Sequence, residues 1–210
     1  MAETGTVEKI LQQAEQAFLR YGLRTVTMSD LAAEMGMSKK TLYRHFGGKE
    51  ELVCAVVRSF LEREYRLMQQ NSEQAEHAID EMFFVAGYVI ALFRRLSPNV
   101  MLEVRKYYAS AWELIEGLHF TRIRKLIESN LGRGVAEGLY RRELDSFVLS
   151  RLYMRLADSL VDEQLFPIEA FERTALFHQF IAYHMYGIVS HRGRELLEEK
   201  LRAIGCIGPE

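Results

Sequence analysis

One short run of the sequence gathers side chains that are suited to holding phosphate groups. Between Ser38 and Lys49 four residues are basic, one is a histidine and none is acidic. Lysine and arginine neutralise nucleic-acid phosphates and release their counterions, and an arginine fork can also pair with the edge of a guanine. The run therefore predicts a surface that faces a polyanion. Its charged and titratable members are Lys39, Lys40, Arg44, His45 and Lys49.

The residues around this run predict two short helices joined by a tight turn. Thr27 is a good helix cap, and Asp30 stands three positions later, as in a capping box. Gly36 can adopt the positive φ that a tight turn requires. Ser38 caps the second helix, whose inner face is Leu42 and Phe46. The outer face of that helix stays exposed, which is the geometry of a helix-turn-helix motif in a major groove.

The rest of the chain predicts an all-α protein. Apolar residues recur every three or four positions, there are three prolines, and no Asn-Gly or Asp-Gly hairpin signal occurs. Gly22 is expected to end the first helix, and Ser97-Pro98 reads as a helix start. Beyond the helix-turn-helix, we expect helices over about 49–70, 72–96, 98–108, 110–135, 145–163, 168–190 and 194–203.

The composition points to a cytoplasmic protein but misleads about its partners. Two cysteines, Cys54 and Cys206, supply no disulfide framework, no signal peptide is visible, and the longest uncharged apolar run, 82–93, is too short to cross a membrane. The net charge of −2 argues against nucleic-acid binding when taken whole. Divided by position, residues 1–50 carry seven basic and six acidic groups, whereas residues 51–210 carry 20 and 23. The positive charge is therefore concentrated on one short helix and its exit.

The segment from about Glu8 to Phe60 resembles the DNA-binding domain of the TetR/AcrR family of bacterial transcriptional regulators. The matching residues are Tyr21-Gly22, Thr27, Leu31-Ala32, Gly36, Ser38, Leu42-Tyr43, Phe46 and Lys49-Glu50-Glu51-Leu52. The resemblance implies an N-terminal helix-turn-helix DNA-binding domain over residues 4–64, with the motif at about 27–46. It also implies a larger helical effector-binding and dimerisation domain over residues 65–210.

The resemblance also implies which residues contact double-stranded operator DNA. They are Thr27, Ser29, Ser38, Lys39, Lys40, Thr41, Tyr43, Arg44, His45 and Lys49. Thr27 and Lys49 would meet phosphates, whereas Lys39, Lys40 and Thr41 would face bases and phosphates. Alternatives remain from the residues themselves: Tyr43 as a packing residue, and Arg44 and His45 as a solvated face.

The C-terminal region predicts a small-molecule pocket and a dimer face. The resemblance implies that some aromatic residues of this region line a cavity for an apolar or aromatic effector, and pockets in helical bundles are mostly apolar with a few polar groups. The candidate ligand-binding residues are Tyr88, Arg105, Tyr108, Trp112 and His119, and core packing is the alternative for each. Two late helices are apolar around much of their circumference, which favours burial against a partner chain. The resemblance implies a homodimer in which these two helices form a four-helix bundle with the same two of a second subunit. The candidate interface residues are Leu149, Leu152, Leu156, Leu160, Phe180, Tyr183, His184 and Gly187.

The sequence encodes no recognisable catalytic chemistry. It has no phosphate-binding glycine loop, no Gly-x-Ser-x-Gly elbow and no Cys/His pair at metal-ligand spacing, so we expect no enzyme, no cofactor and no metal. His178, His184 and His191 are spaced too far apart for one ion. The prediction is a dimeric transcriptional regulator, a repressor released from a near-palindromic operator by its effector. The alternative is a helical carrier of a hydrophobic small molecule with a purely structural helix-turn-helix.

Overall fold

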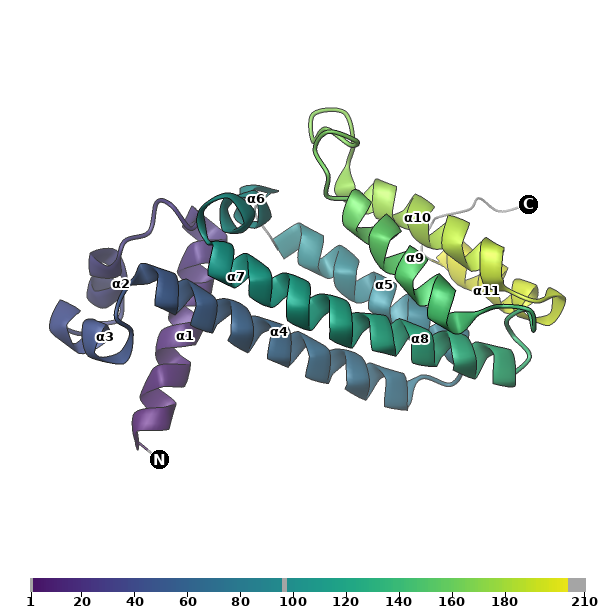
Figure 1. Cartoon of the computed structure of the whole chain (residues 1–210), viewed down its shortest axis with the longest axis horizontal. Helices are drawn as coiled ribbons and strands as arrows, with labels where there is room; N and C mark the ends of the chain where they lie inside the picture. Colours follow the sequence, from purple (N-terminus) through teal and green to yellow (C-terminus); the bar gives the residue numbers. More distant parts are fainter. Residues whose placement is uncertain (1, 96–97, 204–210) are drawn as a thin grey trace. The chain divides into compact units, whose positions relative to one another are not determined.

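A computed structural model describes the backbone of residues 2–95 and 98–203, and omits the side chains of residues 2–4, 93–95, 98–99 and 119. Every regular element in these ranges is helical (Figure 1), which confirms the all-α prediction. Leu96, Ser97 and Cys206 lie outside the described residues. The elements are α1 (Ala2–Tyr21), α2 (Met28–Glu34), α3 (Lys39–His45), α4 (Lys49–Gln74), α5 (Ala78–Arg95), α6 (Pro98–Tyr107), α7 (Ala109–Leu114), the π-helical turn η1 (Ile115–His119), α8 (Phe120–Ala136), α9 (Ser146–Ser159), α10 (Arg173–Ile188) and α11 (His191–Ala203).

The chain packs as two compact units. The first contains the described residues up to Tyr65 together with Arg95–His119, and the second contains Arg66–Arg94 together with those from Phe120 onward. The first unit therefore takes in α6, α7 and η1, in addition to the segment 4–64 that the sequence assigns to DNA binding. The functional division at residue 64 stays a prediction.

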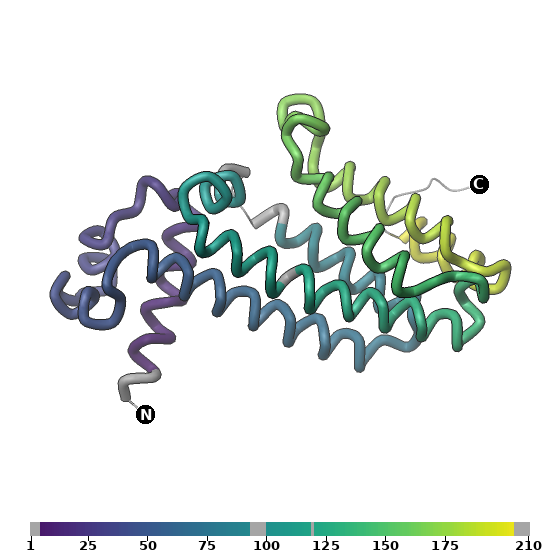
Figure 2. The backbone as a smooth tube through the Cα atoms, in the orientation of Figure 1, coloured from purple at the N-terminus to yellow at the C-terminus, as the bar shows by residue number. Residues whose placement is uncertain are grey.

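The first unit is built on a core that the helix-turn-helix cannot supply alone. Ile10 of α1, Leu31 of α2, Leu42 of α3 and Leu52 of α4 are each fully buried in one cluster. Val104 of α6 is buried in the same cluster. Helices α2 and α3 are neighbours in the chain trace (Figure 2) and pack against each other. Helices of seven residues are too short to be stable by themselves, so the longer α1, α4 and α6 hold them in place.

Two glycines permit the sharp turns of this unit. Gly22 ends α1 with a φ of 85°, and Gly36 sits between α2 and α3 with a φ of 64°. Both values lie in the left-handed region, where a side chain costs free energy. The predicted end of the first helix and the predicted turn of the motif are therefore both confirmed.

The second unit is organised around a buried polar cluster. The Asn130 amide donates to the Ala78 carbonyl and to Glu81 Oε2, both at 2.9 Å. The Tyr140 hydroxyl bonds Asn130 Oδ1 at 3.1 Å, and the ring of Tyr140 lies so close to Gly134 that a Cβ there would meet it at 2.0 Å. Buried polar groups of this kind cost little when every partner is present. The cluster therefore fixes α8 against the start of α5.

Two helices of the second unit begin later than the periodicity predicts. We expect a helix from Ser72, but α4 runs through Ser72 to Gln74 and α5 begins at Ala78. The Arg133 guanidinium donates to the carbonyls of Ser72, Ala75 and Glu76, so it caps the end of α4 at this point. Similarly, α10 begins at Arg173 because the Glu172 carboxylate accepts from the first free backbone amides of that helix.

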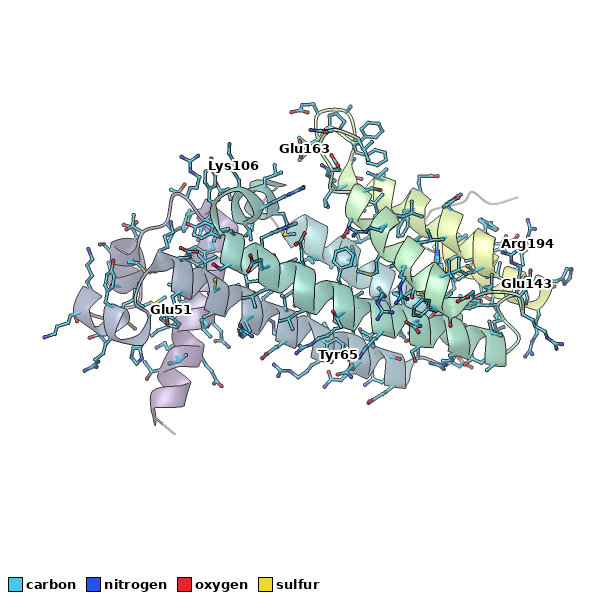
Figure 3. All side chains as sticks on the ribbon, in the orientation of Figure 1. Glu51, Tyr65, Lys106, Glu143, Glu163 and Arg194 are labelled. Carbon is cyan, nitrogen blue, oxygen red and sulfur yellow. The ribbon has the colours of Figure 1, made fainter. Side chains whose placement is uncertain are left out.

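Helices α8 and α9 pack against each other, and α9 and α10 form an antiparallel pair (Figure 1). The connection between α9 and α10 carries Glu163, labelled in Figure 3, whose carboxylate pairs with Arg173 Nη2 at 3.1 Å. Within the described ranges, no helix combines the length and the apolar character needed to span a membrane.

Candidate nucleic-acid interface

The start of α2 is fixed by a complete capping box. The Asp30 amide donates to Thr27 Oγ1 at 3.2 Å, while the Thr27 amide and hydroxyl donate to Asp30 Oδ2 at 2.9 and 2.7 Å. The hydrogen bonds from Thr27, more than any other effect, hold the pKa of the Asp30 carboxyl below its usual value. The predicted cap is confirmed, and Ser29 lies exposed in the first turn of the helix.

The start of α3 is capped in the same way by Ser38. Its hydroxyl accepts from the Thr41 amide at 3.0 Å and lies 2.8 Å from Thr41 Oγ1. The hydroxyls of both residues are therefore engaged with each other. Because Ser38 fixes the first turn, the side chains that follow it are held in a defined register.

The outer face of α3 is exposed and positively charged. Lys39, Lys40 and Arg44 are all exposed, and His45 is half-buried. The Tyr43 side chain is 41% exposed, and the Lys39 ammonium lies 5.8 Å from the centroid of its ring. Tyr43 is therefore not a buried core residue, and its contact with DNA stays a prediction. The same helix turns Leu42 fully into the core, so the polar and apolar faces separate cleanly.

Lys49 lies at the start of α4 and is the most enclosed of the candidate phosphate contacts. Its ammonium donates to the Arg24 carbonyl at 3.3 Å. Partial burial lowers the pKa of Lys49, while the carboxylates of Glu103 and Asp30 act in the opposite direction. Lys49 thus joins the connection between α1 and α2 to the helix that follows α3.

Sequence reasoning missed the residue that ties α6 to this connection. The Glu103 carboxylate accepts from the Leu23 amide at 2.7 Å and from the Arg24 amide at 3.2 Å. The Arg24 guanidinium lies 4.8 Å from the ring centroid of Tyr107 and bonds its hydroxyl at 3.3 Å. We call Glu103, Leu23, Arg24 and Tyr107 the α6 junction. Its partners are about 80 residues apart, so no local spacing in the sequence signals it.

The candidate ligand-binding residues fall in different parts of the fold. Arg105, Tyr108 and Trp112 belong to the first unit, and Tyr88 belongs to the second. Tyr108 is buried, and its hydroxyl donates to the Leu23 carbonyl at 3.5 Å. The Arg105 guanidinium lies 5.5 Å from the Trp112 ring centroid. The side chain of His119 lies outside the described residues.

Tyr88 is the member of this set with an unsatisfied polar group. It lies half-buried on α5, and its hydroxyl oxygen is buried without a hydrogen-bond partner in the described part of the chain. Burial raises the pKa of the Tyr108 hydroxyl, and the Glu103 and Glu50 carboxylates raise it further. Tyr108 therefore stays neutral as a structural donor, and the binding of a ligand by Tyr88 stays a prediction.

The candidate dimer residues divide into exposed and buried groups. Leu152 and Leu156 on α9 and Tyr183 and Gly187 on α10 are exposed, with Leu152 at 53% and Tyr183 at 73%. Leu149 is half-buried, whereas the chain buries Leu160, Phe180 and His184 in its own interior. Val148, one turn before Leu152, is also exposed and was missed, although its four-residue spacing to Leu152 and Leu156 was visible in the sequence.

Residues 10–56 match the family model described as bacterial regulatory proteins, tetR family. The HTH-type transcriptional repressor KstR2 of Mycolicibacterium smegmatis is 28% identical over 142 residues, covering 66% of this chain and 69% of that protein. The structure of the ketosteroid transcriptional regulator KstR2 of Mycobacterium tuberculosis superposes with a TM-score of 0.53 at 21% identity, covering 89% of this chain and 96% of that one. A transcriptional regulator from Cytophaga hutchinsonii gives a TM-score of 0.75 at 18% identity, covering 89% of this chain and all of that one.

Proposed function

The chain belongs to the TetR family of bacterial transcriptional regulators, and on that premise we propose that it is a homodimeric repressor released from a near-palindromic operator by a small apolar or aromatic effector. Repression and DNA binding follow from the family and from the relatives named as repressors. The operator, the dimer and the effector are the parts that we propose for this chain.

The observation that carries the proposal is the exposed basic face of α3, which we call the recognition helix. Lys39, Lys40 and Arg44 project from a helix whose first turn is fixed by Ser38. Base contacts specify a DNA sequence only when the side chains that make them are held in register. The capped start of α3 supports such a register, and Arg44 is the residue best suited to a guanine edge.

Phosphate contacts flank the recognition helix in this proposal. Lys49 follows α3 at the start of α4, and Thr27 and Ser29 lie at the start of α2. Phosphate contacts position a protein on the duplex without reading its sequence. Lys39, Lys40 and Lys49 would neutralise phosphates, while Thr41, Tyr43 and His45 supply further polar contacts along α3.

The experiment measures how binding to a duplex from the protein's own promoter depends on salt. We expect the affinity to fall steeply between about 50 and 200 mM salt, and Lys39→Ala or Lys49→Ala to lower the slope by about one unit per lost phosphate contact. Lys125→Ala is the matched control, because Lys125 is an exposed lysine on α8 in the other unit. Unchanged slopes in both test variants would exclude the phosphate assignment. A carrier protein would show no salt-dependent binding at all.

The exposed apolar stripe on α9 and α10 supports the homodimer. Val148, Leu152 and Leu156 recur every four residues on α9, and Tyr183 and Gly187 do so on α10. An exposed apolar patch of this kind is typical of an interaction surface. A two-fold dimer would set the two recognition helices about 34–36 Å apart or a multiple of that spacing, so that each reads one half-site.

The unsatisfied hydroxyl of Tyr88 supports an effector with at least one polar group. A buried hydroxyl without a partner costs about 1–3 kcal/mol, which a ligand oxygen or nitrogen would recover. The relative from Mycobacterium tuberculosis is named a ketosteroid transcriptional regulator, and the FadR regulator of Bacillus subtilis was solved with stearoyl-CoA. The ketosteroid skeleton named for the first protein and the stearoyl chain of the second ligand are both largely apolar, which is the class that we propose.

A further inference from the structure

The first unit contains an apolar cavity of about 80 Å³ that none of the candidate effector residues lines. It lies between α1, α4 and α6, with one wall from η1, and we call it the α1–α4–α6 cavity. Its lining residues are Glu15, Phe18, Leu19, Leu23, Val53, Val56, Val57, Phe60, Leu61, Val100, Met101, Val104 and Ile115.

The lining gives water little to bind. Glu15 is the single charged residue in it, and both of its carboxylate oxygens accept from the Arg63 guanidinium, at 2.7 and 3.1 Å. A buried water needs two to four polar partners, and apolar cavities that lack them stay dry and take up small apolar molecules. The chemistry of the walls therefore selects an uncharged, apolar occupant.

The volume limits how large that occupant can be. An engineered apolar cavity of about 150 Å³ binds benzene or xenon, and this one is roughly half that size. The cavity is also partly open to solvent. A single small ring or a short alkyl group is therefore the largest group that it could enclose, and only with slight expansion of the walls. A polycyclic or long-chain molecule could not be enclosed here, and none of the candidate effector residues lines the cavity, so this is a separate site.

The walls of the cavity are continuous with the residues that position the helix-turn-helix. Leu23 lines the cavity, while its amide donates to Glu103 in the α6 junction. Val104, the neighbour of Glu103 on α6, lines the cavity as well. Val53 lies one turn after Lys49 on α4. A molecule that expands the cavity on its α6 side would therefore push α6 away from Leu23 and strain the junction.

We propose that the α1–α4–α6 cavity binds one small uncharged apolar molecule, no larger than a single ring, and that its occupancy lowers the affinity of the neighbouring helix-turn-helix for DNA. The second clause rests on the proposed DNA-binding function. A ligand shifts a conformational equilibrium only by its differential affinity for the two states. Here the difference arises because the expanded cavity and the intact α6 junction exclude each other.

The test uses benzene as the probe on the full-length protein. Methyl-labelled leucine and valine signals are followed by NMR, and promoter DNA binding is followed by fluorescence anisotropy with and without benzene. We expect saturable shifts centred on Leu23, Val57 and Val104, and a loss of DNA affinity of roughly fivefold or more, the usual lower end of allosteric coupling.

A cavity-filling variant and a matched control complete the experiment. Val57→Ile adds one methylene to the cavity wall, so it should weaken benzene binding at least fivefold and remove the effect of benzene on DNA. Val7→Ile makes the same change at a half-buried valine of the same core that does not line the cavity, and it should respond like the wild type.

The possible results separate the two claims. Absent shifts, shifts centred on other residues, or a Val57→Ile protein that responds like Val7→Ile would each overturn the binding site. Shifts in the cavity with unchanged DNA affinity would overturn the coupling. A wild-type protein that fails to bind promoter DNA without benzene would instead refute the proposed function, while the NMR shifts would still decide whether the cavity binds benzene.

Discussion

Hydroxyl groups at the starts of α2 and of the recognition helix are engaged within the protein itself. Thr27 both donates to and accepts from Asp30, and Ser38 is bonded to Thr41. Any contact of Thr27 or Ser38 with a phosphate must therefore share or replace an existing hydrogen bond. The freely projecting groups are the charged ends of Lys39, Lys40 and Arg44. At the scale of single residues, the Thr27 and Ser38 hydroxyls thus fix the helix starts in the free protein, and we expect the cations to contribute most of the contacts with DNA.

Gly193 marks a backbone approach that tolerates no side chain. A Cβ at this position on α11 would lie 2.1 Å from the Leu139 carbonyl oxygen, which also accepts from the Ser190 amide at 2.8 Å. We expect Gly193→Ala to destabilise the protein by about 1–3 kcal/mol, as overpacking usually does. Thermal denaturation should show a lowered Tm. Gly132→Ala on α8, where no atom lies within 4 Å, should instead raise stability by up to about 1 kcal/mol.

His184 couples folding to pH because it is buried as a neutral imidazole. Burial lowers its pKa to about 4, and its Nε2 has no hydrogen-bond partner in the described part of the chain. The unfolded chain binds a proton near pH 6.5, so the free energy of unfolding should fall as pH drops from 6.5 towards 4. We expect a loss of about 2 kcal/mol between pH 7 and pH 5 from this residue.

Urea denaturation at pH 7 and pH 5 measures this loss against His184→Phe. The aromatic variant keeps the ring contact with Tyr153, which lies 4.8 Å from His184 centroid to centroid, but has no proton to bind. The pH dependence of the wild type should exceed that of the variant. Equal slopes in the two proteins would contradict a neutral buried His184.

At the scale of elements, α6 acts as a support for the helix-turn-helix. Glu103 holds two backbone amides of the connection between α1 and α2, and Ser110 of α7 bonds Glu50 of α4 at 3.2 Å. The short α2 and α3 therefore depend on a segment that comes more than fifty residues later in the chain. This dependence explains why the first compact unit includes residues 95–119.

Glu103→Ala tests this support. Removing the carboxylate leaves the partly buried Leu23 amide without its acceptor, at a cost of about 1–3 kcal/mol, whereas the exposed Arg24 amide can bond water instead. We expect faster hydrogen exchange at both amides and weaker promoter binding. Glu113→Ala, an exposed glutamate on α7, should change neither. Protection of Leu23 that survives Glu103→Ala would show that α6 does not hold the connection.

At the scale of the whole molecule, charge is segregated. The run from Ser38 to Lys49 carries four basic residues and no acid, while residues 51–210 carry more acidic than basic groups. A negative body is repelled by phosphates, so the cationic face directs the encounter with DNA. In a dimer, two such faces would meet two half-sites. The dimer would then discriminate between DNA sequences more strongly than one face alone.

Leu152→Glu combined with Tyr183→Glu tests the dimer. Both side chains are exposed on the proposed interface, so the double variant should fold and sediment at half the mass of the wild type at micromolar concentration. Its operator affinity should fall by at least tenfold, because two half-sites are no longer bound together. Leu67→Glu, an exposed leucine of α4, is the control and should leave the dimer intact. A wild-type monomer would refute the proposal.

The sequence by itself determined the features that depend on neighbours a few residues away. The capping box of Thr27 and Asp30, the turn at Gly36 and the basic face of α3 all follow from spacings of three or four residues, and the structure confirms each conformation. The same locality explains why residues 10–56 alone match the family model. Helical period and capping are short-range effects, so they are visible without tertiary contacts.

Only the tertiary structure decided which apolar residues are buried within the chain and which stay exposed. Leu152 and Leu160 share a helical face in the sequence, yet one is exposed and the other is buried. Similarly, the bonds of Glu103 with Leu23 and Arg24 join residues about 80 positions apart. Burial and such long-range contacts depend on how the helices pack, and periodicity describes the face of a helix without naming the neighbour that covers it.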